Sequence, residues 1–205
     1  MKKHNFILII MIVFLVILIC ACESGSQHEP PAYEPGTLTI TFEYEKISGM
    51  ASNQFAVWIE DVDGQLIQTL YATRWTANGG YKNRPDSIAL WVEKSNLASM
   101  QKSEVDAITG ATPRAGSLAY VWNLADVSGN AILPGEYKFL VEGTLRWKNH
   151  VIYSGVIEIG DEPVTVQADA DFIYEASDRY AALTSDSPEN SMISQVTASF
   201  IPADN

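Results

Sequence analysis

Apolar and polar residues alternate along short segments of this chain, most clearly in Thr37–Lys46. There Leu38, Ile40, Phe42 and Tyr44 fall on one face, and threonine and glutamate side chains fall on the other. Such alternation is typical of a strand with one buried face. Similar apolar segments predict further strands at Gln54–Glu60, Gln65–Tyr71, Ser117–Trp122, Tyr137–Leu145, Val151–Ile159, Val164–Ala168 and Met192–Phe200.

Turn residues separate these segments, and one stretch has a helical pattern. Asp63-Gly64 lies between two predicted strands and predicts a hairpin turn. Asp61 and Asp63 also match the opening of a calcium loop, but the closing glutamate of such a loop is missing, so we favour the turn. Asp86–Gln101 has an approximate apolar stripe and a capping residue, which predicts one short helix. Many short strands with few helices predict a mainly β fold, a single Ig-like β-sandwich domain.

The N-terminus has the pattern of a secretory signal. Lys2 and Lys3 precede an apolar run at Phe6–Ile19, and Ala21-Cys22 follows. This end resembles a bacterial lipoprotein signal, which implies cleavage before Cys22, a lipid on the Cys22 sulfur and a location on the extracytoplasmic side of a cell membrane. The alternative is an uncleaved N-terminal helix. We therefore expect a signal peptide at 1–21, a lipidated cysteine with a flexible tether at 22–36, and the folded domain at 37–205.

Composition and charge restrict the chemistry that this domain can perform. The chain has 205 residues and a formal net charge of −12, which becomes −14 once Lys2 and Lys3 leave with the signal. This acidity argues against nucleic acid as a partner. His150 is the one histidine of the predicted folded domain, in a polar stretch that reads as an exposed turn. A Cys/His zinc site is therefore excluded, and a Ser–His or Cys–His nucleophile has only this one base available.

The segment Asp106–Pro113 contains the pattern D-x-x-[S/T]-G-A-T. It resembles the site at which a periplasmic, magnesium-dependent flavin transferase attaches FMN, taken from FAD, to subunits of redox pumps. The resemblance implies that Thr112 is the attachment site, and that Asp106, Thr109, Gly110 and Ala111 are recognition positions. Small residues beside the acceptor suit a backbone that must enter another enzyme's pocket. The alternative is a loop whose threonines form local turn hydrogen bonds.

Two further resemblances concern larger parts of the chain. The run from Trp122 to Tyr137, with its Pro134-Gly135 turn, is similar to the Ig-like domain of flagellar hook-capping proteins. Together with Phe55–Asp61, the Trp75 region, Asp106–Pro113 and Met192–Pro202, this run resembles the domain of unknown function 2271 family of bacterial periplasmic proteins. That family implies an extracytoplasmic, flavin-related redox setting.

Three functions remain open from the sequence. The first is a membrane-tethered electron carrier with covalent FMN on Thr112, served by a flavin transferase and by redox partner proteins. The second is a non-catalytic Ig-like binding or structural module of the cell envelope. The third is a ligand-binding or metal-binding lipoprotein that uses Asp169, Asp171 and Glu175, although a solvated strand edge explains these acids better. A tryptophan side chain can stack on a ring, but packing in the core explains most of the five tryptophans of this chain. They are Trp58, Trp75, Trp91, Trp122 and Trp147.

Overall fold

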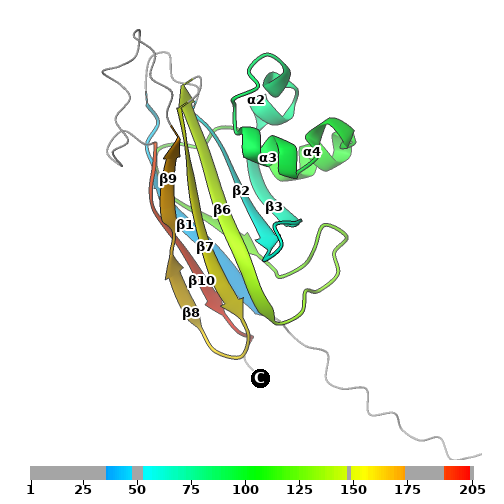
Figure 1. Cartoon of the computed structure of the whole chain (residues 1–205), viewed down its shortest axis with the longest axis vertical. Coiled ribbons are helices and arrows are strands. Elements are labelled where there is room, and N and C mark those ends of the chain that lie inside the picture. Colours follow the sequence, from blue (N-terminus) through cyan, green and yellow to red (C-terminus); the bar gives the residue numbers. More distant parts are fainter. Residues whose placement is uncertain (1–35, 48–52, 147–148, 174–191, 204–205) are drawn as a thin grey trace, which may run out of the picture. The chain divides into compact units, whose positions relative to one another are not determined.

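A computed structural model describes residues 36–47, 53–146, 149–173 and 192–203, and these lie within one compact unit, Glu34–Asn205. Two β-sheets form this unit (Figure 1). The smaller sheet has four antiparallel strands in the order β5 (Gly116–Trp122), β1 (Thr37–Tyr44), β10 (Ile193–Ile201) and β8 (Val164–Gln167).

The larger sheet has six strands. Their order is β4 (Thr109–Gly110), β3 (Leu66–Thr73), β2 (Gln54–Asp61), β6 (Gly135–Arg146), β7 (Asn149–Ile159) and β9 (Asp169–Ile173). Every pairing in it is antiparallel except that of β3 with β4. All eight predicted strands are present; the short β4 was not predicted, and β9 corresponds to the strand edge that was favoured for Asp169 and Asp171.

The main hydrophobic core lies between the two sheets. β1 contributes the alternating side chains Leu38, Ile40, Phe42 and Tyr44, each at most 2% exposed, as its sequence pattern predicted. The facing strands contribute apolar residues that include Phe55, Val57, Ile59, Phe139, Val141 and Phe200. Two sheets packed through such faces make a β-sandwich, so the predicted fold class is confirmed.

A layer of short helices covers part of the outer face of the larger sheet, beside β2 and β3 (Figure 1). It consists of α2 (Arg74–Ala77), the 3-10 turn η1 (Gly80–Lys82), α3 (Ala89–Lys94), the 3-10 turn η2 (Leu97–Ser99) and α4 (Lys102–Ile108). A second core cluster joins the layer to the sheet through Trp58, Trp91 and Leu140, among others. β2 is consequently buried on both faces from Gln54 to Glu60.

The prediction of one helix at Asp86–Gln101 was wrong in detail. The backbone of Ile88 and of Asn96 is left-handed, with φ of 44° and 50°, so α3 cannot extend beyond these residues at either end. The last helix, α4, starts at a capping box in which Gln101 and Glu104 bond each other's backbone N–H groups. The spacing of apolar residues does not depend on backbone handedness, so it gave no sign of the breaks at Ile88 and Asn96 and predicted one continuous helix.

Two connections agree with their predictions. At Asp63-Gly64 the chain makes a hairpin turn, with Gly64 at φ 81° and the Asp61 N–H donating to the Gln65 carbonyl at 2.9 Å. The run from Trp122 to Tyr137 connects β5 of the smaller sheet to β6 of the larger one. In that run the Tyr137 hydroxyl donates to the Leu133 carbonyl at 2.8 Å, which holds the turn before β6.

Candidate functional site

The segment with the D-x-x-[S/T]-G-A-T pattern lies at one edge of the larger sheet. Asp106 is exposed on α4, and Thr109 and Gly110 form β4, which pairs in parallel with Ala72 and Thr73 of β3. Ala111 and Thr112 follow directly and are both exposed. The structure therefore places Asp106 on α4 and Thr109 and Gly110 on a short strand, with Ala111 and Thr112 exposed just beyond them.

Tyr71 of β3 holds this edge in place. Its hydroxyl donates a hydrogen bond to the Ala111 carbonyl at 2.9 Å, and its ring leaves no room for a side chain on Gly110, where a Cβ would come within 2.6 Å of the ring. The ring itself packs on Phe55 and Tyr120, each with its ring centroid 5.0 Å away. Burial raises the pKa of Tyr71 to about 12, so the phenol keeps its proton and remains a donor at neutral pH. Glycine is thus required at position 110 by packing, in addition to any role in recognition.

Gly110→Ala is expected to lower the free energy of unfolding by about 1–3 kcal/mol, because the new methyl group meets a ring that its neighbours prevent from moving. Urea unfolding measures this change. Gly160→Ala is the matched control, since a Cβ there meets no atom within 4 Å. Equal stability of the two variants would contradict the packing of Tyr71 on Gly110.

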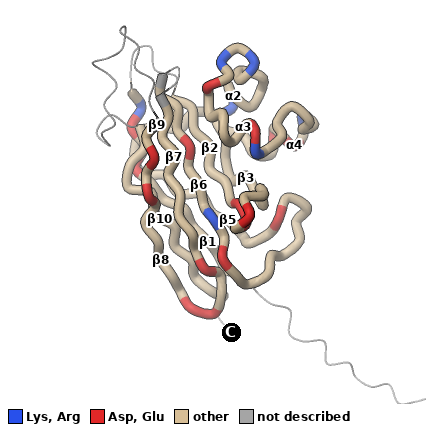
Figure 2. Tube along the Cα trace, in the orientation of Figure 1, with Lys and Arg blue, Asp and Glu red and all other residues tan. Residues whose placement is uncertain are grey.

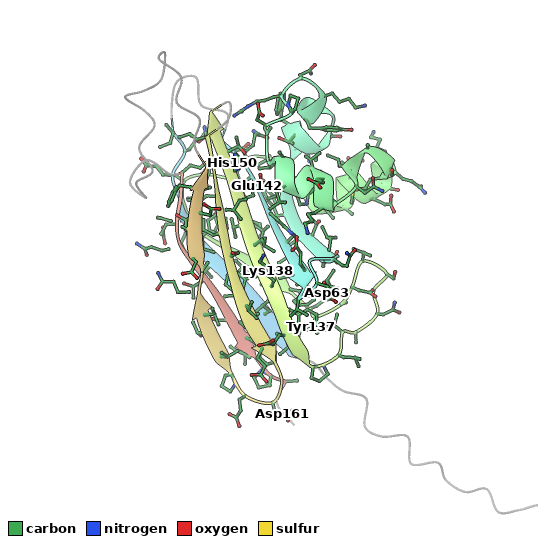
Figure 3. The ribbon with its side chains drawn as sticks, viewed as in Figure 1. Asp63, Tyr137, Lys138, Glu142, His150 and Asp161 are labelled. Carbon is green, nitrogen blue, oxygen red and sulfur yellow. The ribbon has the colours of Figure 1, made fainter. Side chains whose placement is uncertain are left out.

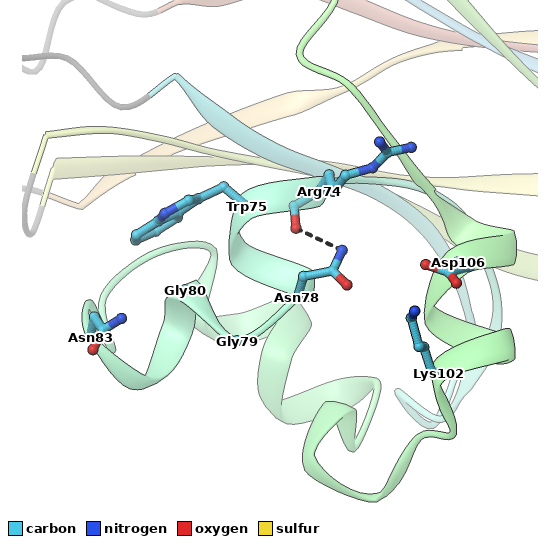
Figure 4. A pocket seen from close by; sticks show the side chains of 8 residues that line it. All are labelled: Arg74, Trp75, Asn78, Gly79, Gly80, Asn83, Lys102 and Asp106. Atoms are coloured by element: carbon cyan, nitrogen blue, oxygen red, sulfur yellow. Dashed lines mark hydrogen bonds between the residues drawn. The ribbon is translucent and has the colours of Figure 1, made fainter.

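A polar hollow of about 700 Å³ lies beside this segment, between α2, η1 and α4 (Figure 4). It contains two basic side chains, Arg74 and Lys102, the carboxylate of Asp106 and the indole of Trp75, which is 47% exposed. The backbone of Gly80 lies against that indole, because a Cβ on Gly80 would come within 2.6 Å of the ring. We call this the α2–α4 hollow, and its lining is Arg74, Trp75, Asn78, Gly79, Gly80, Asn83, Lys102 and Asp106.

Sequence reasoning singled out Trp75 and Asp106 but missed Arg74 and Lys102. These two cations are far apart in the sequence and match no motif. They line one hollow only because α2 and α4 lie side by side on the larger sheet. No local pattern in the sequence predicts that arrangement.

A buried carboxylate, Glu142 of β6, was also missed (Figure 3). It is fully buried between the larger sheet and the helical layer, where it accepts hydrogen bonds from the backbone N–H groups of Leu90 at 3.2 Å and Trp91 at 2.9 Å. Burial raises its pKa to about 7 against the opposing effect of these N–H groups. Its contacts are with the first turn of α3, so its role is to fasten that helix to the sheet.

The remaining candidates occupy structural positions. His150 is a half-buried residue of β7 that pairs with Thr144, so the expected exposed turn was wrong; the strand extends two residues further than predicted (Figure 3). Asp169 and Asp171 are exposed on β9, which forms the edge of the larger sheet opposite β4. In the described part of the chain, no group of three His, Cys, Asp or Glu side chains is arranged to hold a metal ion.

The tryptophans divide between core and surface. Trp58, Trp91 and Trp122 are at most 1% exposed, as core packing predicted, and Trp75 is the one that remains accessible among the tryptophans that the structure describes. Trp147, Glu175 and Cys22 lie outside the described residues.

Comparison with known proteins gives one family. Residues 37–173, from the start of β1 to the end of β9, match the model of a family described as predicted periplasmic protein (DUF2271). This range includes the whole Asp106–Pro113 segment and the α2–α4 hollow. No curated protein and no solved structure matches the chain. Among the described residues, no helix has both the length and the apolar character needed to cross a membrane.

Proposed function

Since this chain belongs to the DUF2271 family of predicted periplasmic proteins, we propose that it is a membrane-anchored extracytoplasmic lipoprotein that carries FMN covalently on Thr112 for electron transfer. Cys22 is the lipid attachment site in this proposal. The bound flavin supplies reversible electron acceptance, which no side chain of the domain offers. A membrane redox protein is the donor, and a second extracytoplasmic redox protein is the acceptor.

The observation that supports this proposal most directly is the accessibility of Thr112 beyond a fixed edge. The residue is exposed, and the backbone just before it is held by β4 pairing and by the Tyr71 hydroxyl. A transferase needs a hydroxyl that it can reach on a backbone of defined shape, because the reacting oxygen must meet the phosphorus in line. Both requirements fit the residues present.

The attachment reaction balances with FAD as donor. The Thr112 Oγ forms a bond to the phosphorus of the FMN half, and the bond from that phosphorus to the bridging oxygen breaks. AMP leaves with the bridging oxygen, and the threonine proton passes to the transferase or to solvent. No oxidant or reductant is consumed in this step.

Thr112→Ala is expected to abolish flavin attachment, because alanine has no hydroxyl to form the phosphodiester. The full chain is expressed with and without a magnesium-dependent flavin transferase, and intact mass and in-gel flavin fluorescence are measured. Thr165→Ala, which removes an exposed hydroxyl on β8, is the matched control and should keep the added mass.

Two results would contradict this proposal. One is a wild-type chain that gains no FMN mass in the presence of the transferase. The other is an added mass that survives Thr112→Ala. The first result would favour a non-catalytic Ig-like module of the cell envelope instead.

A further inference from the structure

Arg74 lies next to the exposed end of the segment Asp106–Pro113, which we call the attachment segment. In the parallel pairing of β3 with β4, Thr73 is opposite Gly110, and each strand ends there. The next residues along the chain are Arg74, which begins α2, and Ala111, so Arg74 and Thr112 each lie within two residues of the last paired positions. In Figure 4 the Arg74 side chain extends from α2 toward the chain that leads away from α4.

The surroundings of Tyr71 agree with this placement. Tyr71 bonds the Ala111 carbonyl, and the positive charge of Arg74 lowers the Tyr71 pKa against the larger effect of burial. Arg74 is therefore close to the residue that holds the attachment segment. It also lines the α2–α4 hollow, as does Asp106 of the motif that ends at Thr112.

The α2–α4 hollow has the composition of a site for a singly charged organic anion with an aromatic ring. Two cations, Arg74 and Lys102, outnumber the one carboxylate, Asp106. The lining of the hollow carries a net positive charge although the whole chain is acidic, and Figure 2 shows both basic and acidic residues along the helical layer. Exposed Trp75 offers a ring for stacking, and the side-chain amides of Asn78 and Asn83 offer donors and acceptors.

We propose that the α2–α4 hollow is the seat of the flavin attached at Thr112, with Arg74 as the counter-ion of the phosphodiester and Trp75 as the stacking surface for the ring. This inference rests on the proposed function. A phosphodiester carries one negative charge, and a guanidinium binds two of its oxygens in a planar, charge-assisted pair. The hydroxylated ribityl chain between phosphate and ring suits the two asparagine amides.

Arg114 is the competing cation. It is exposed and comes two residues after Thr112 in the chain, but it does not line the hollow. If Arg114 bound the phosphodiester instead of Arg74, the flavin ring would lie outside the α2–α4 hollow. The two arginines therefore serve as a matched pair in the experiment.

The experiment compares flavin fluorescence of the same loaded protein before and after denaturation. Full-length wild type and the variants Arg74→Gln, Trp75→Leu, Arg114→Gln and Lys82→Gln are each loaded by the transferase. Intact mass gives the fraction of chains that carry flavin. Native fluorescence divided by the fluorescence after denaturation then gives the quenching due to the folded protein alone, and fluorescence anisotropy reports how tightly the ring is held. Circular dichroism confirms that each variant is folded.

We expect strong quenching and high anisotropy in the wild type, because an indole in contact with a flavin quenches its fluorescence. Trp75→Leu should raise the native fluorescence several-fold, and Arg74→Gln should raise it while lowering the anisotropy. Arg114→Gln and the surface control Lys82→Gln should match the wild type.

Two outcomes overturn this inference alone: a loaded wild type that is as bright in the native state as after denaturation, or a larger effect of Arg114→Gln than of Arg74→Gln. A wild type without FMN mass overturns the proposed function, and this inference with it. Because the mass is measured independently of the fluorescence, the two failures are distinguishable. If Trp75→Leu does not fold, Arg74→Gln decides the outcome, since an exposed arginine is replaced without loss of core packing.

Discussion

Trp91→Ala is expected to lower the free energy of unfolding by about 3–5 kcal/mol. The indole is fully buried between α3 and the outer face of the larger sheet, and its Nε1 donates a hydrogen bond to the Thr69 hydroxyl at 3.1 Å. Truncation leaves a cavity and removes the hydrogen-bond donor of a buried hydroxyl, and both effects destabilise the folded state. Urea unfolding followed by circular dichroism measures the change.

Trp75→Ala is the matched control, because it removes the same side chain from the same helical layer at a position that is 47% exposed. Its effect should be much smaller. An unchanged unfolding midpoint in Trp91→Ala would mean that the helical layer adds nothing to the stability of the sandwich, contrary to the shared core of Trp58, Trp91 and Leu140.

The stability of the protein is expected to fall as pH rises from about 4.3 to about 7, by up to about 4 kcal/mol from Glu142 alone. Burial raises the pKa of this carboxyl to about 7 in the folded protein, whereas an unfolded chain has the ordinary value of about 4.3. Between these values the folded state binds the extra proton, so stability decreases with rising pH. The stabilising contribution of the protonated Glu142 carboxyl is complete below its pKa in the unfolded chain. It is lost as pH rises through its pKa in the folded protein.

Glu142→Gln tests this dependence, because glutamine keeps the size of the side chain and has no proton to lose. Urea unfolding midpoints at pH 5 and pH 8 should differ in the wild type and converge in Glu142→Gln. Glu136→Gln changes an exposed carboxyl on the same strand and should retain the wild-type difference. If the unfolding midpoint still depends on pH in Glu142→Gln, another titratable group causes the dependence.

The fold was predictable wherever one strand face was buried. β1 alternates because Leu38, Ile40 and Phe42 face the other sheet while its threonines do not. In β2 the alternation disappears, since Ala56 and Trp58 are covered by helices on the opposite face from Phe55 and Val57. A strand whose residues are apolar without alternation therefore indicates that both of its faces are covered, here by the other sheet and by the helical layer. The break at Ile88 leaves no such sign in the sequence, because a β-branched residue seldom adopts a left-handed backbone.

The candidate site was predictable only as a motif. The pattern Asp106–Thr112 identified which hydroxyl to consider, and the structure adds that it is exposed beside Tyr71. Tyr71 is 39 residues before Gly110 in the numbering, and nothing local in the sequence links the two. Their contact follows from the parallel pairing of β3 with a two-residue strand, which is too short to have a periodicity of its own.

By itself, the sequence determined the strand faces, the scarcity of histidine and the presence of one threonine in an attachment-like motif. Each of these depends on residues close together in the chain or on composition. Only the tertiary structure decided that helices pack on the larger sheet, that Glu142 is buried beneath α3, and that Arg74, Trp75 and Lys102 line one hollow together with Asp106 of the motif. Those features arise from packing between distant segments, where burial and electrostatic fields depend on every neighbour at once.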